Sequence, residues 1–173
     1  MMAQTLPPAQ LSRELREGVS PDLSRRRWAI GLSFLGCAIG AVVGAYQTGI
    51  IKRLPDIAPG SIWDAEKVDA SDYAYSRLQT PDATLMIVTY GITAALVAAG
   101  GKDRARNNPA LPLAAAAKAL YDFVTCARLG REEWNENQAL CSWCQLATLV
   151  SAATLALAMP EASRAVRALG DQD

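Results

Sequence analysis

Residues 28–51, WAIGLSFLGCAIGAVVGAYQTGII, form an unbroken run of uncharged side chains. A run of this kind matches the roughly 20 residues that an α-helix needs to cross the hydrocarbon core of a membrane. Two further runs, 83–101 and 139–159, also carry no charge, and a fourth, 110–127, carries only two charged side chains. The sequence therefore predicts four membrane-spanning helices.

The average composition hides this pattern. The chain has 173 residues, of which 51% are hydrophobic, with 17 Lys and Arg against 17 Asp and Glu, and its mean hydropathy of +0.09 is that of a soluble protein. A soluble four-helix bundle is the alternative, but its helices would each keep one polar face. Gly36, Gly40 and Gly44 recur at intervals of four, which allows close helix contact in lipid. We expect an all-α integral membrane four-helix bundle.

The connections suggest an organisation and an orientation. We expect residues 1–27 to be a cytoplasmic tail, 28–160 the transmembrane domain and 161–173 a second cytoplasmic tail. The first tail is not a signal peptide, because the apolar run after it is too long. With both termini inside, ten Lys and Arg lie on the inner side and six on the outer side, as the positive-inside rule favours. Residues 52–82 then form a long outer loop.

Two features of the composition exclude functions. A net charge of zero gives no electrostatic basis for nucleic-acid binding. The absence of histidine excludes imidazole acid–base catalysis, a Ser-His-Asp triad and histidine metal ligands.

Cysteine supplies the remaining chemistry. Cys37 and Cys126 fall inside predicted helices and are expected to be small buried hydrophobes. Cys141 and Cys144 form a Cys-Ser-Trp-Cys motif at the outer start of the last helix. Their i, i+3 spacing puts both sulfur atoms on one helical face, and the first turn of a helix favours a thiolate. A thiolate attacks disulfides, so we predict a redox pair.

Several alternatives stay open at this point. The motif could be half of a zinc site, but two more ligands are missing, so we predict no metal. It could also be only structural. Trp143 could line a pocket or anchor the helix at the membrane surface. Lys118 and Asp122 could form a neutralised pair within the bundle, or Asp122 could deliver protons.

With these motifs the chain resembles the vitamin K epoxide reductase family, which includes bacterial quinone-linked disulfide-forming enzymes. The resemblance covers roughly residues 28–160. It rests on the four-helix plan, Gly44-Ala45-Tyr46-Gln47-Thr48, Thr80-Pro81-Asp82 and Ala139-Leu140-Cys141-Ser142-Trp143-Cys144.

The resemblance implies a multi-pass protein of the bacterial inner membrane that holds ubiquinone or menaquinone near the periplasmic surface. It also implies that Cys144 passes electrons to the quinone. Cys141 would exchange disulfides with a thioredoxin-like or other thiol protein on the outer face. Trp143 and Thr148 are the candidate quinone contacts.

The chain also departs from the family pattern. Many members carry a second cysteine pair between the first two helices, whereas residues 52–82 contain no cysteine. We predict a membrane thiol–disulfide oxidoreductase coupled to quinone reduction. Because the second cysteine pair is missing, Cys141 would accept electrons directly from the thiol partner. The alternative is a degenerate, non-catalytic membrane subunit that binds a partner, a lipid or a quinone without turnover.

Overall fold

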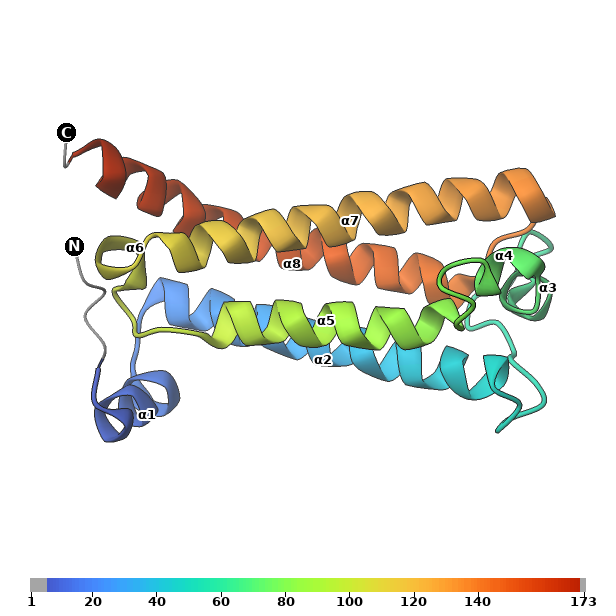
Figure 1. Ribbon diagram of the computed structural model, residues 1–173, viewed down its shortest axis with the longest axis horizontal. Helices are drawn as coiled ribbons and strands as arrows, with labels where there is room; N and C mark the ends of the chain where they lie inside the picture. The colour runs from blue at the N-terminus through green and yellow to red at the C-terminus, as the bar shows by residue number, and fades with distance from the viewer. Residues whose placement is uncertain (1–5, 172–173) are drawn as a thin grey trace.

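The computed structural model describes residues 6–171, and within that range every regular element is a helix. The helices are α1 (Pro8–Glu17), α2 (Pro21–Gln47), α3 (Ala65–Asp69), α4 (Asp72–Tyr75), α5 (Asp82–Ala98), α6 (Arg104–Asn107), α7 (Ala110–Asn137) and α8 (Ser142–Gly170). The four longest, α2, α5, α7 and α8, lie side by side as a bundle (Figure 1). The predicted all-helical class is confirmed.

Three of these helices, α2, α7 and α8, are long and apolar enough to cross a membrane. The fourth, α5, is equally apolar in character but has only 17 residues. At 1.5 Å per residue it is about 25 Å long, at the short limit for a span. The fold is compatible with a membrane bundle, and the count of four spans stays a prediction.

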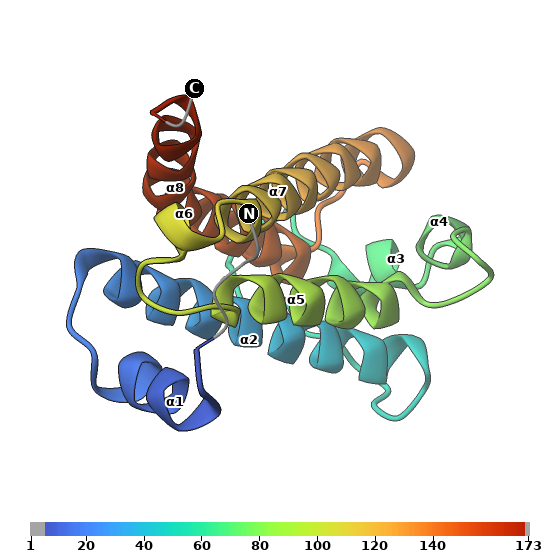
Figure 2. The ribbon, with the colours of Figure 1, turned by 60° about the vertical axis from the view of Figure 1, so that its left-hand side comes forward.

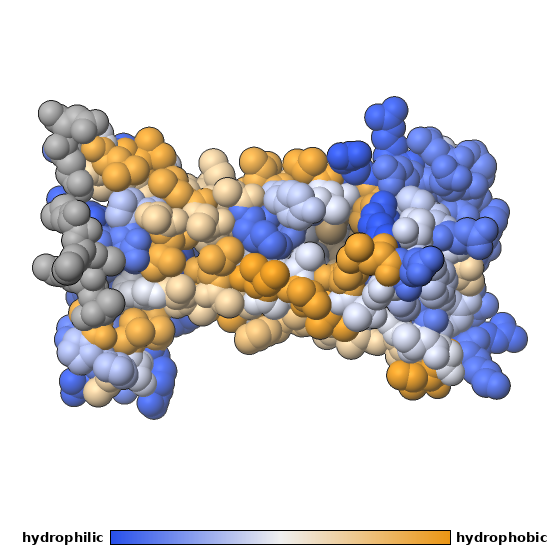
Figure 3. Space-filling view, in the orientation of Figure 1, coloured by the Kyte–Doolittle hydropathy of each residue, from blue (hydrophilic) through white to orange (hydrophobic). Residues whose placement is uncertain are grey.

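Many large apolar side chains lie on the outside of the bundle, and many of the buried residues are small. Phe34, Val88 and Leu149 are exposed, whereas Ala115 and Ser151 are almost fully buried. On the face drawn in Figure 3, apolar residues cover much of the middle of the molecule, and hydrophilic residues are most frequent toward the ends. This distribution suits helices that pack through small residues and present apolar side chains to lipid.

The glycines of α2 allow α5 to approach closely. A Cβ atom on Gly36 would lie 2.6 Å from the ring of Tyr90, and one on Gly40 would lie 2.9 Å from Ile87. Gly36 and Gly40 therefore make the close helix contact that their spacing predicted.

The two ends of the bundle differ. Helices α1 and α6 and the last turns of α8 lie at one end, and α3 and α4 lie at the other (Figures 1 and 2). At the first end, the buried Arg26 guanidinium donates hydrogen bonds to five consecutive carbonyl groups at the end of α5. Buried Arg104 pairs with Glu161 at 2.7 Å. The Arg26 contacts supply hydrogen-bond donors and positive charge to carbonyl groups that have no partner within α5.

Several helices extend beyond the apolar runs. Helix α2 begins at Pro21, within the expected N-terminal tail, and α1 lies before it. Helix α8 continues through Pro160 to Gly170, within the expected C-terminal tail. The parts of those predicted tails at 1–5 and 172–173 lie outside the described residues.

Candidate active site

The Cys-Ser-Trp-Cys motif lies at the α3 and α4 end of the bundle, where it begins α8. Cys141 is the N-cap residue, and its Sγ atom accepts a hydrogen bond from the backbone N–H of Cys144 at 3.3 Å. The two sulfur atoms lie within 4.8 Å of each other, and both residues are free thiols. The spacing of the motif thus brings the sulfur atoms together as expected. Cys141 is fully buried, whereas Cys144 is half-buried.

The loop between α2 and α5 brings a carboxyl group to this pair. Asp69, the last residue of α3, is 1% exposed, and the Cys144 thiol donates to its Oδ1 atom at 3.8 Å. Burial raises the pKa of the Asp69 carboxyl to about 7, and hydrogen bonding from the thiols offsets only part of this effect. Asp69 was missed as a site residue because only folding of the loop places it there.

The burial of Cys141 acts against the thiolate that we expected at a helix start. Hydrogen bonding with Cys144 works to lower the pKa of the Cys141 thiol. Burial and the adjacent Asp69 outweigh it, so this pKa lies above its usual value. Cys141 is therefore a protonated thiol at neutral pH in this reduced state.

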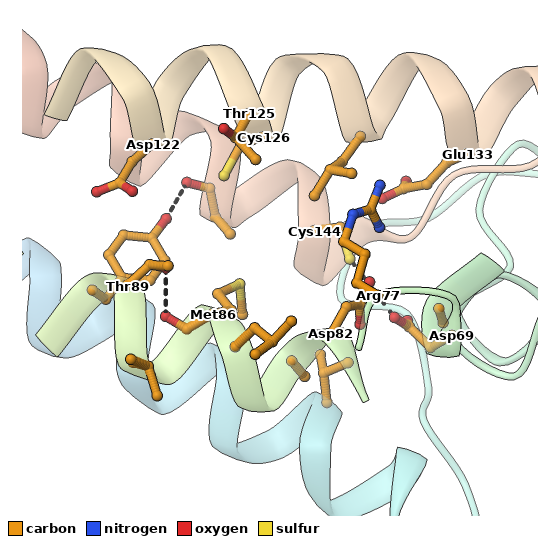
Figure 4. A pocket seen from close by; sticks show the side chains of 18 of the residues that line it. Asp69, Arg77, Asp82, Met86, Thr89, Asp122, Thr125, Cys126, Glu133 and Cys144 are labelled. Atoms are coloured by element: carbon orange, nitrogen blue, oxygen red, sulfur yellow. Dashed lines mark hydrogen bonds between the residues drawn. The ribbon is translucent and has the colours of Figure 1, made fainter. Parts of the chain in front are cut away.

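An apolar cavity of about 340 Å³ lies beside Cys144, between α5 and α7 (Figure 4). Its walls also include Ala147 of α8 and Val43 of α2. Two lining residues, Val88 and Tyr121, are exposed on the outer surface of the bundle, so the cavity opens toward the lipid-facing side.

Ten residues with polar groups also contribute to the wall of this cavity, although most of its exposed wall area is apolar. They are Asp69, Tyr73, Arg77, Asp82, Thr89, Tyr90, Asp122, Thr125, Cys126 and Glu133. Most are already engaged: the Tyr90 hydroxyl, for example, bonds to the Ala147 carbonyl at 2.7 Å and to Ser151 at 2.8 Å. Two residues are engaged through one atom only, because Asp69 Oδ2 and Arg77 Nη1 are buried without a hydrogen-bond partner.

The other predicted site residues lie beside this cavity without lining it. The Trp143 indole donates to the Pro55 carbonyl at 3.0 Å. The Thr148 hydroxyl donates to the Cys144 carbonyl within its own helix, also at 3.0 Å. Neither side chain is among the cavity-lining residues, whereas Ala147, between them in sequence, is.

Three residues without an assigned role are also located. Cys37 of α2 lies beside the backbone of α5 and donates to the Ile87 carbonyl at 3.6 Å. Lys118 and Asp122 form an ion pair at 2.5 Å, and Asp122 lines the far part of the cavity.

A segment that we call the strap, residues 54–64, covers the motif. Asp56 accepts hydrogen bonds from the backbone and hydroxyl of Ser142, at 3.0 and 2.6 Å. The backbone of Leu140 pairs with the strap on both sides of Trp63. The strap and α3 together explain why Cys141 is buried.

Asp69, Cys141 and Cys144 offer three potential metal-ligand atoms within 4.8 Å of one another. Structural zinc sites use four protein ligands. The structure adds Asp69 to the two ligands that the sequence supplied, and our expectation of no metal stays a prediction.

A bundle of apolar helices with two adjacent thiols beside an apolar pocket is the arrangement expected of a membrane protein of the thiol oxidoreductase class. The chain matches the family model described as "Vitamin K epoxide reductase family" over residues 27–159, and it belongs to that family. Comparisons with curated proteins and with solved structures found no match. The family is one of multi-pass membrane thiol–disulfide oxidoreductases that generally use a quinone and a thiol partner. The predicted family is confirmed, whereas the predicted domain limits of 28–160 stay a prediction.

Proposed function

We propose that this chain oxidises dithiols through the Cys141–Cys144 pair and transfers the electrons to a membrane quinone in the cavity. The observation that carries this proposal is the position of Cys144. It is close to Cys141 on one side and lines the apolar cavity on the other. Electrons that enter the pair can leave it toward a molecule dissolved in lipid.

The cavity fits a quinone head group. Its volume of about 340 Å³ falls within the range of about 300–1,000 Å³ that is usual for small-molecule sites. Its lining is mostly apolar, and the unpartnered Arg77 Nη1 offers a donor suited to a carbonyl oxygen. A bound quinone supplies a two-electron, two-proton acceptor. The opening toward lipid beside Val88 and Tyr121 suits a ligand that arrives through the membrane.

The two cysteines have different tasks in this proposal. Cys141 forms the mixed disulfide with an incoming thiol, and Cys144 completes the exchange and faces the quinone. The donor is a thioredoxin-like protein or another thiol compound, because residues 52–82 offer no second cysteine pair. Since Cys141 is fully buried, the strap must move before the donor can react.

We also propose an orientation. The positive charges favour a cytoplasmic location for the α1 and α6 end, which places the motif on the periplasmic side of a bacterial inner membrane. Ubiquinone and menaquinone can be distinguished by comparing the rates that each supports in the same assay.

The test is quinone-dependent oxidation of dithiothreitol by the purified protein in lipid nanodiscs. We expect Cys144→Ser and Cys141→Ser each to lower the rate at least 100-fold. Cys37→Ser, which removes a thiol outside the site, should leave it unchanged. If the wild-type protein oxidises neither dithiothreitol nor a reduced thioredoxin-like protein with either quinone, the proposal is wrong.

The second candidate is a non-catalytic membrane subunit. Two observations favour it: residues 52–82 lack cysteine, and the thiol that should meet the donor is buried. Such a subunit would bind quinone in the same cavity without any change in the redox state of Cys141 and Cys144.

A further inference from the structure

The two carboxyl oxygens of Asp69 have different surroundings. Oδ1 accepts a hydrogen bond from the Cys144 thiol at 3.8 Å. Oδ2 is buried and has no hydrogen-bond partner. The residue lines the cavity from the end of α3 and is labelled beside Cys144 in Figure 4.

A buried polar atom without a partner is unfavourable by about 1–3 kcal/mol, and such atoms are rare in native proteins. Within residues 6–171 three side-chain atoms are in this state, and the third, in Asn137, belongs to a residue that does not line the cavity. The remaining two, in Asp69 and Arg77, both belong to cavity-lining residues. A ligand in the cavity would supply the missing partners.

We propose that Asp69 is a catalytic proton relay between the Cys144 thiol and the quinone. Its Oδ1 atom takes the thiol proton, and its Oδ2 atom delivers a proton to a quinone oxygen. The inference rests on the proposed function and adds to it the residue that moves a proton.

The step balances in protons and electrons. The S–H bond of Cys144 breaks as an O–H bond forms at Oδ1, and the O–H bond at Oδ2 breaks, so Asp69 gains and loses one proton. Two electrons leave the sulfur atoms as the Cys141–Cys144 disulfide forms, and the quinone is reduced to the quinol. The thiol proton of Cys141 supplies the second proton of the quinol.

The charges around Asp69 suit a group that changes its protonation state. Burial raises the pKa of the Asp69 carboxyl most. The like charges of Asp82 in α5 and Glu133 in α7, which face it, raise this pKa further. From α2, Gln47 donates to its backbone carbonyl at 3.4 Å. Because the pKa of Asp69 lies at about 7, both of its protonation states are populated near neutral pH, as a relay needs.

The first arm of the test measures turnover of Asp69→Asn, which keeps the shape but cannot pass a proton through its two atoms. We expect kcat to fall at least 100-fold, within the usual range for acid–base groups, while the KM for quinone changes less than threefold. Asp72→Asn, an exposed carboxyl in the same loop, is the matched control and should match the wild type.

The second arm needs no quinone. In a Cys141→Ser background, the alkylation rate of Cys144 is followed against pH by peptide mass spectrometry. With Asp69 present, we expect an inflection near pH 7. In Asp69→Asn we expect the inflection to become clearly smaller, with Glu133 as the remaining acidic neighbour of Cys144. We also expect Cys144 to react at least as fast, because a neighbouring negative charge has been removed.

The outcomes separate the two proposals. A kcat of Asp69→Asn within threefold of the wild type would overturn the relay alone. So would a parallel loss of alkylation and turnover, because that result indicates a structural role. Absence of quinone reduction in the wild type would overturn the proposed function and the relay with it. An unchanged pH profile in the alkylation arm would show that Asp69 and Cys144 are not coupled, which overturns the relay and leaves the proposed function standing.

Discussion

Charged residues inside this bundle are held by specific partners. Lys118 donates to the Thr89 carbonyl, the Thr93 hydroxyl and Asp122, so that all three of its protons are engaged. Asp122 also accepts from Thr93 at 2.5 Å. This arrangement favours the first of our two interpretations of the pair, neutralisation within the bundle.

The first prediction concerns this pair. Lys118→Met leaves Asp122 buried without its counter-charge, and loss of one partner of a buried pair costs about 3–5 kcal/mol. We expect a clearly lower free energy of unfolding, measured by chemical denaturation in detergent. The double variant with Asp122→Asn should recover most of the loss. If the single variant is as stable as the wild type, the pair is not a structural element.

The second prediction concerns Asp69 and pH. Its pKa rises from 3.8 to about 7 on folding, so the folded state binds the proton more tightly than the unfolded state does. The contribution to stability is fully present below pH 3.8 and is lost as the pH rises through 7. Each tenfold difference in proton affinity between the two states corresponds to about 1.4 kcal/mol.

We therefore expect the thermal stability of the wild type to fall between pH 5 and pH 8 relative to Asp69→Asn, which cannot ionise. Paired melting curves across this range check the prediction. Identical pH dependence in the two proteins would show that Asp69 keeps an ordinary pKa.

At the scale of elements, the strap covers Cys141 and is held to two helices. Asp56 joins it both to the start of α8, through Ser142, and to α3, through the Ala65 backbone N–H at 2.9 Å. Each hydrogen bond to a charged group contributes about 1.5–3 kcal/mol. The strap therefore holds the motif closed in the reduced state.

The third prediction is that Asp56→Ala exposes Cys141. Loss of these bonds should raise its alkylation rate at least tenfold, as measured by peptide mass spectrometry. Asp72→Ala removes an exposed carboxyl from the same loop and serves as the control. Equal rates in the two variants would mean that the strap does not limit access.

The positions of the long helices could be predicted from the sequence more fully than the side chains that meet at the candidate site. Uncharged runs identify helices because apolar side chains must meet lipid, and the i, i+3 spacing brought Cys141 and Cys144 together. Asp69 and Arg77 could not be found in this way, since their positions depend on how an irregular loop folds back over the bundle. Thr148 illustrates the same limit within a helix: Ala147 lines the cavity, and Thr148 bonds to its own backbone.

At the scale of the whole molecule, the fold combines a bundle of apolar helices with a covered pair of thiols, the candidate redox site, at one end. The small core residues bring α2 and α5 together, while the cavity lies between α5 and α7. Cys144 of the motif lines this cavity, and Cys141 lies beneath the strap. The central claim is therefore that electrons pass from the pair to a molecule in the cavity.

A single-turnover experiment tests this claim most directly. Fully reduced protein in nanodiscs is mixed without oxygen with one equivalent of a short-chain ubiquinone or menaquinone, then alkylated and analysed by mass spectrometry. We predict that the number of free thiols falls from four to two, that the new disulfide joins Cys141 to Cys144, and that one equivalent of quinol forms. Four free thiols and unchanged quinone after prolonged incubation with either compound would contradict the claim.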